Sequence, residues 1–119
     1  NKVILMGRLT KDIEMRQTPN GVSLVRFSIA VTRRFKNSNG EYDADFINCV
    51  AWRKTGEFIA RYFQKGSMIA IVGSIQTRSW DGNDGKKQYA TEVIVDEATL
   101  PAQNLKVVQA VIPICLIVV

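Results

Sequence analysis

Short apolar runs separated by turn-forming residues make up most of this chain. Strand-length apolar patterns cover residues 2–10, 22–35, 42–53, 67–80 and 88–96. Side chains that alternate with a period of two predict strands with one buried face. We therefore expect five strands.

Turn residues mark the breaks between these strands. Thr18-Pro19-Asn20-Gly21 is a strong turn sequence, because Pro pre-sets φ and Asn-Gly tolerates positive φ. Polar loops with glycine follow at residues 36–41 and 81–85. Gly7 interrupts the first apolar run, and this predicts a bulge or sharp bend in that strand.

One helix is predicted between the third and fourth strands, with Thr55 as its N-cap and Gly66 in the left-handed position after its last turn. Its apolar stripe consists of Phe58, Ile59, Tyr62 and Phe63. Such a stripe is typical of a helix that faces the core. This order of five strands and one helix matches the oligonucleotide/oligosaccharide-binding (OB) fold, a Greek-key barrel, over residues 1–100.

Sorting strand positions by face separates the expected barrel interior from its surface. The inward positions are Val25, Phe27, Ile29 and Val31 on the second strand, Ile47, Cys49 and Ala51 on the third, and Ile69, Ile71 and Ile75 on the fourth. The opposite faces carry Phe46, Asn48, Val50 and Trp52 on the third strand, and Gln76, Arg78 and Trp80 on the fourth. Both strands are thus expected to present a Trp outward.

The composition excludes several kinds of catalytic chemistry. The 119 residues include no histidine, so neither a Ser-His-Asp triad nor a His-ligated zinc site can form within the chain. Two cysteines, Cys49 and Cys115, are too few for a Cys-rich metal site and are interpreted as reduced thiols. We accordingly expect no catalytic residue, cofactor or metal. The weaker alternative is a metal-dependent nuclease that uses loop carboxylates such as Asp81 and Asp84.

Positive charge gathers beside the aromatic residues. The chain has 16 Lys and Arg against 11 Asp and Glu. The combined set is Arg33, Arg34 and Phe35; Phe46; Trp52, Arg53 and Lys54; and Arg78, Trp80, Lys86 and Lys87. Cations neutralise phosphates, and unstacked bases lie on aromatic faces. The interleaving therefore predicts a surface for single-stranded nucleic acid.

The chain also resembles the bacterial single-stranded DNA-binding protein family. The matching stretches are residues 1–9, 18–21, 62–67, 76–80 and 89–93, in the family's order and spacing. The resemblance implies an OB-fold protomer, usually a homotetramer, that binds single-stranded DNA without sequence preference in replication, recombination and repair. It implies that the aromatics at Phe35, Phe46, Trp52 and Trp80 stack on bases. It also associates Lys54, Lys65 and Arg78 with the DNA path.

Residues 101–119 depart from this resemblance. The segment from Val107 to Val119 is nearly all apolar, and it lacks the acidic tip through which family members recruit replication and repair proteins. Thirteen residues are fewer than the roughly 20 that span a bilayer, so we expect a subunit contact and not a membrane anchor. No leader sequence is visible, and we expect a cytoplasmic, nucleoid-associated protein.

Two further interpretations stay open at this point. A related OB module could bind structured RNA or a replication protein. An assembly role is also possible in principle, but it leaves the interleaved aromatic and basic residues unexplained.

Overall fold

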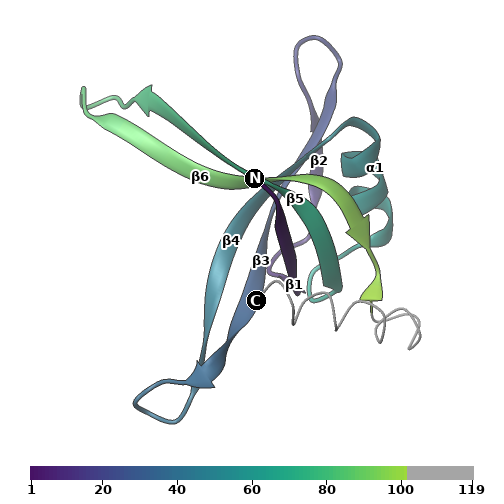
Figure 1. The fold of residues 1–119 in the computed structure, drawn as a ribbon. Helices are drawn as coiled ribbons and strands as arrows, with labels where there is room; N and C mark the ends of the chain where they lie inside the picture. Colours follow the sequence, from purple (N-terminus) through teal and green to yellow (C-terminus); the bar gives the residue numbers. More distant parts are fainter. Residues whose placement is uncertain (102–119) are drawn as a thin grey trace.

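The computed structural model describes residues 1–101 (Figure 1). Its elements are β1 (Val3–Leu9), β2 (Glu14–Gln17), β3 (Ser23–Lys36), β4 (Tyr42–Trp52), α1 (Arg53–Tyr62), β5 (Met68–Asp81) and β6 (Lys87–Thr99). Cys115 and nearly all of the apolar segment 101–119 lie outside the described residues. The expectations for that segment are therefore not addressed by the structure.

Five strands close into a barrel. Neighbouring strands follow the order β1-β5-β6-β4-β3, and β1 pairs with β3 as well as with β5, which completes the ring. All pairings are antiparallel except a short parallel one between β4 and β6. This is the Greek-key OB barrel that the strand pattern predicted.

Gly7 pairs with β5 and lies next to Arg8, where β1 also begins to pair with β3; of the predicted bulge or sharp bend, the register shows no bulge. The register of β1 with β5 runs through Gly7 without a shift. A Cβ at this position would lie 2.7 Å from the carbonyl oxygen of Ala30 on β3. The glycine is therefore explained by the close approach of two backbones.

Strand β2 was not predicted. Its four residues are all exposed, and they pair with the start of β3 from Glu14↔Arg26 to Gln17↔Ser23. A strand with no buried face leaves no alternation in the sequence. Residues 1–101 thus contain six strands, and their helix lies between β4 and β5.

All five barrel strands contribute to the interior, with Leu9 from β1 and Val93 and Val95 from β6 beside the inward faces of β3, β4 and β5. Val25, Ile29, Ala51 and Ile71 have no exposed surface, and Cys49 is 1% exposed. These positions were all predicted to face inward. Ile75 was predicted there too, wrongly.

Ile75 is 44% exposed. It follows a register shift between Val72 and Gly73, beyond which β5 continues with β6 toward the hairpin end. Val50 departs in the opposite sense, because it was placed on the outward face and is 2% exposed. Period-two sorting could not foresee either departure, since it assumes that a strand stays in the barrel over its whole length, whereas β5 pairs with β1 only as far as Gly73, and that only one face is covered.

Helix α1 begins three residues earlier than predicted. It starts at Arg53, directly after β4, and Trp52 occupies the N-cap position without a side-chain cap. Thr55, the predicted N-cap, lies inside the helix. Arg53 makes the turn with a positive φ of 56°. Gly66 has a positive φ as predicted, although the helix already ends at Tyr62.

Only half of the helical stripe belongs to the core. Ile59 and Phe63 are buried, whereas Phe58 and Tyr62 are 37% and 52% exposed. The ring centroids of Phe58 and Tyr62 lie 5.0 Å apart at the margin of the barrel. The prediction that the whole stripe is core is therefore wrong for these two residues.

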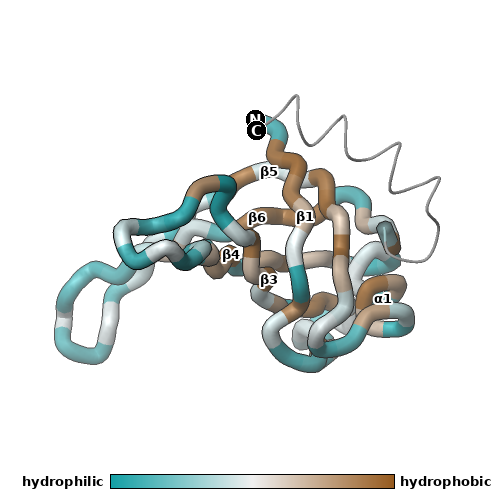
Figure 2. Tube along the Cα trace, turned by 90° about the horizontal axis from the view of Figure 1, so that it is seen from below, coloured by the Kyte–Doolittle hydropathy of each residue, from teal (hydrophilic) through white to brown (hydrophobic). Residues whose placement is uncertain are grey.

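The ends of two hairpins extend from the barrel on the side away from α1 (Figure 1). One joins β3 to β4 and the other joins β5 to β6. Figure 2 shows that these extensions are mostly hydrophilic, while the apolar residues concentrate in the barrel and under α1. The backbones of these hairpin ends pair with each other outside the core. Their side chains can therefore face a ligand without uncovering the apolar residues of the barrel.

Candidate nucleic-acid interface

Four aromatic side chains predicted to contact bases lie on the surface. Phe35 is 81% exposed, Phe46 is 70%, Trp80 is 43% and Trp52 is 40%. Trp is normally among the more buried residues. Rings of this size at the surface give flat apolar faces on which planar ligands can stack.

The β5–β6 hairpin carries the closest aromatic–cation contact. The guanidinium carbon of Arg78 lies 4.5 Å from the centroid of the Trp80 ring. Arg78 Nε also donates to a carboxylate oxygen of Glu92 at 2.9 Å. Lys86 and Lys87 are exposed at the end of the same hairpin, and Lys87 pairs with Asp81 in the strand register.

The β3–β4 hairpin separates two arginines that the sequence grouped together. Arg34 lies over the Phe35 ring, with its guanidinium carbon 5.9 Å from the ring centroid. Arg33 instead donates three hydrogen bonds to Asp45 on β4, the shortest at 2.8 Å from Nη2 to Oδ1. This hydrogen bonding raises the pKa of Arg33 and lowers the pKa of Asp45. Arg33 thus has part of its charge satisfied within the protein.

A third cluster surrounds the start of α1. Trp52, Arg53 and Lys54 are exposed, and they line a surface hollow together with Gly21 and Val22 from the turn before β3. The pairing of β4 with β3 fixes the position of Trp52, because Trp52 pairs with Leu24 at the end of the strand. Phe46 lies six residues earlier on the same face, about 20 Å away at the rise of a strand.

Lys65 is the predicted cation that the structure joins least to the others. It is exposed in the loop after α1, and its backbone N–H donates to Asp12 Oδ1 at 2.9 Å. Among residues 1–101, its ammonium makes no cation–π contact with a predicted aromatic.

Two exposed tyrosines beside the site were missed by the sequence analysis. Tyr42 is 57% exposed, and the Lys36 ammonium lies 5.8 Å from its ring centroid. Tyr89 is 75% exposed and pairs with Ser79, next to Trp80. Aligning the two predicted strands of each hairpin in the sequence would have placed both tyrosines near the predicted aromatics.

The loop carboxylates serve local structure. Asp84 Oδ1 accepts a hydrogen bond from the backbone N–H of Lys86 at 3.0 Å, which closes the hairpin end. Asp43 Oδ1 accepts from the Asn37 side chain at 3.1 Å. Within residues 1–101, no three His, Cys, Asp or Glu side chains come together in a way that could hold a metal ion.

Cys49 lies in the barrel interior. Its burial removes the thiol from water, which raises its pKa from 9.0 to about 12. The group therefore stays protonated near neutral pH, where its nucleophilicity is low. None of the helical structure within residues 1–101 has the length and apolarity needed to cross a bilayer.

The fold and this surface together define an OB barrel with aromatic rings and cations displayed on two hairpins and at the start of α1. The model of the Single-strand binding protein family matches residues 1–101. The chain belongs to this family.

Its relatives carry the corresponding name. A single-stranded DNA-binding protein of Oceanobacillus iheyensis is 54% identical over 96 residues, which cover 81% of this chain and 60% of the relative. One from Bacillus cereus is also 54% identical, over 81% of this chain and 56% of the relative. Single-stranded DNA-binding protein 3 of Listeria innocua is 52% identical, with 81% and 60% covered. The chain thus matches less than two thirds of the length of these relatives.

Proposed function

We propose that residues 1–100 form a domain that binds single-stranded DNA without sequence preference. The observation that carries this proposal is the exposure of Phe35, Phe46, Trp52 and Trp80 beside cations on a barrel of the Single-strand binding protein family. Bases stack on the rings, and exposed Lys and Arg neutralise the phosphates. Every base has a π-face, so such stacking tolerates any sequence.

The cations of the proposed site are Arg33, Arg34, Arg53, Lys54, Lys65, Arg78, Lys86 and Lys87. Two of them already pair with carboxylates, Arg33 with Asp45 and Arg78 with Glu92. Within residues 1–101 the other six form no ion pair. We therefore assign the main electrostatic contribution to these six.

The cellular role that follows is protection of single strands during DNA replication, recombination and repair. The names of the relatives support DNA binding as the activity. We further propose a homotetramer in the cytoplasm, associated with the nucleoid, with replication and repair proteins as partners. Light scattering with and without dT oligomers would test the assembly, and a monomer under both conditions would contradict it.

Substituting Trp52 tests the stacking directly. Trp52→Ala should weaken binding of a dT oligomer by roughly 1–3 kcal/mol, the usual contribution of one stacked base. Its circular dichroism spectrum should match that of the unsubstituted chain, because Trp52 is partly exposed at the surface. Tyr62→Ala serves as the control, because it removes an exposed ring that lies on α1, outside the proposed site. Unchanged affinity in Trp52→Ala would assign that ring to packing.

Competition separates this function from its alternatives. Single-stranded DNA should displace a labelled dT oligomer far better than duplex DNA or folded RNA does. Preference for either competitor would favour an RNA-binding or partner-binding OB module. Cleavage of the labelled oligomer with added Mg²⁺ or Mn²⁺, if it follows the protein through purification, would indicate a nuclease.

A further inference from the structure

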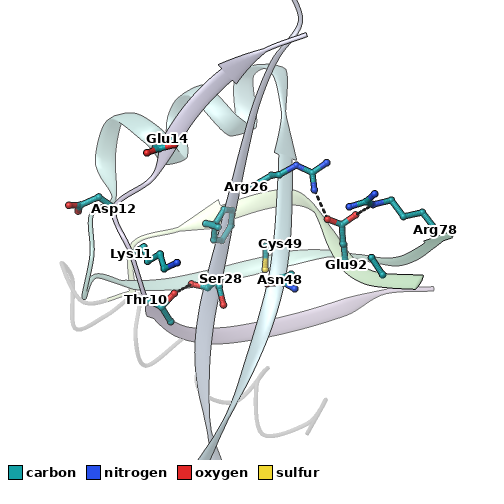
Figure 3. Close-up of a pocket in the computed structure, with 12 residues that line it drawn as sticks. Thr10, Lys11, Asp12, Glu14, Arg26, Ser28, Asn48, Cys49, Arg78 and Glu92 are labelled. Carbon is teal, nitrogen blue, oxygen red and sulfur yellow. Dashed lines mark hydrogen bonds and ion pairs between the residues drawn. The ribbon is translucent and has the colours of Figure 1, made fainter. Parts of the chain in front are cut away.

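One carboxylate on β6 joins guanidiniums from two other strands. Glu92 accepts a hydrogen bond from Arg78 on β5 at 2.9 Å through Oε1, and one from Arg26 on β3 at 2.7 Å through Oε2 (Figure 3). The Glu92 side chain is only 11% exposed, whereas both arginines are about half exposed. A carboxylate this far from water is tolerated because both of its oxygens are paired.

The strand register extends this contact toward Trp80. Glu92 pairs with Gln76, and Gln76, Arg78 and Trp80 share one face of β5. Arg78 therefore lies between the carboxylate and the indole along a single row of side chains. Its Nε donates to Glu92 while its guanidinium carbon lies 4.5 Å from the Trp80 centroid.

We propose that Glu92 is a positioning residue for DNA binding, which holds Arg78 against one face of Trp80 so that the ring stays in place for a base. This inference rests on the proposed function. A planar guanidinium can satisfy a carboxylate at its edge and an indole at its face at the same time. Arg78 then orients the indole, and its charge is compensated within the protein.

A purely structural role for Glu92 gives different expectations. Because Arg26 pairs with the same carboxylate, Glu92 also connects β3 to β6 and β5. If that connection were its only role, losing Arg26 would affect the site as much as losing Glu92. Positioning instead requires that the exposure of the Trp80 ring changes when Glu92 or Arg78 is replaced but not when Arg26 is replaced.

The first test measures Trp80 in the absence of DNA. The chain has two tryptophans, so Trp52→Phe leaves Trp80 as the only one. In this background, Glu92→Gln and Arg78→Gln should both increase acrylamide quenching of Trp80 fluorescence, whereas Arg26→Gln should leave it unchanged. Equal quenching in all variants, or an equal increase in Arg26→Gln, would overturn the proposal.

The second test measures how binding of a dT oligomer depends on salt, in the full chain with Trp52 present. Glu92→Gln releases Arg78 to meet a phosphate, which should steepen the slope of log affinity against log salt by about 0.7. At high salt, where charge is screened, its affinity should fall about two- to fivefold through loss of the ordered cation–π contact. Arg78→Gln should weaken binding similarly with its slope unchanged, and this second variant keeps the test decisive if Glu92→Gln does not fold.

Glu97→Gln is the matched control, since it changes charge by the same amount on the same strand. Glu97 is exposed and forms no ion pair within residues 1–101. A slope and a high-salt affinity shared by Glu92→Gln and Glu97→Gln would refute positioning. If the unsubstituted chain failed to bind the oligomer, the proposed function itself would fail, while the quenching test without DNA would still decide whether Glu92 holds Trp80.

Discussion

Salt should weaken DNA binding by an amount set by the cations that remain unpaired. Arg34, Arg53, Lys54, Lys65, Lys86 and Lys87 form no ion pair within residues 1–101. Each phosphate neutralised on a single strand contributes about −0.7 to the slope of log affinity against log salt. If all six cations meet phosphates, the slope is about −4, and a fourfold rise in salt weakens binding about 300-fold.

Removing two of these charges should change that slope by a calculable amount. Lys86→Gln combined with Lys87→Gln leaves four cations, so the salt dependence should become shallower, with a slope of about −3. Both side chains are exposed at the end of the β5–β6 hairpin, so we expect the melting temperature to change little.

The assay is fluorescence anisotropy of a labelled dT oligomer across a series of salt concentrations. The control combines Lys2→Gln with Arg61→Gln, which also removes two exposed charges but lies outside the proposed site. This control should lower affinity slightly and keep the slope. A slope that falls equally in the control and in the hairpin variant would show that net charge, and not a defined path, governs binding.

Three further predictions concern the barrel. Gly73→Ala would place a Cβ against the carbonyl oxygen of Ile94, so it should lower the urea midpoint, with a cost of about 1–3 kcal/mol; an unchanged midpoint would contradict the backbone contact. Ile59→Ala should cost about 2–5 kcal/mol, since Ile59 is fully buried, and exposed Phe58→Ala should cost clearly less in the same urea unfolding; equal losses would refute this packing. Iodoacetamide at about pH 8 should label Cys49 only after unfolding, as peptide mapping would show, because burial raises the pKa of the native thiol to about 12; rapid native labelling would disprove its burial.

The strands of the barrel could be predicted because each has one face fully covered. Val25 and Ile29 on β3, and Cys49 and Ala51 on β4, alternate with more polar positions and are buried as expected. β2 has no such face, and its pairing with β3 depends on backbone hydrogen bonds that no side-chain pattern records. The early start of α1 was missed for a similar reason, since no capping side chain marks it.

The residues of the candidate site could be predicted from the sequence, but their contacts could be predicted only in part. Clusters of cations near aromatics are visible in the sequence, and the four rings are indeed exposed. Their partners lie on other strands. Asp45 forms an ion pair with Arg33 across the β3–β4 hairpin, and Glu92 forms one with Arg78 across the β5–β6 hairpin. Long-range register of this kind follows from the closed barrel and not from any local pattern.

Titration with poly-dT at low salt tests the central claim most directly, because both tryptophans of the chain belong to the proposed site. The account predicts that the intrinsic tryptophan fluorescence is quenched as bases stack on Trp52 and Trp80, reaches a plateau at saturation and recovers when salt releases the DNA. Unchanged fluorescence at DNA concentrations where anisotropy shows full binding would mean that the bases do not reach these rings, and it would contradict the account.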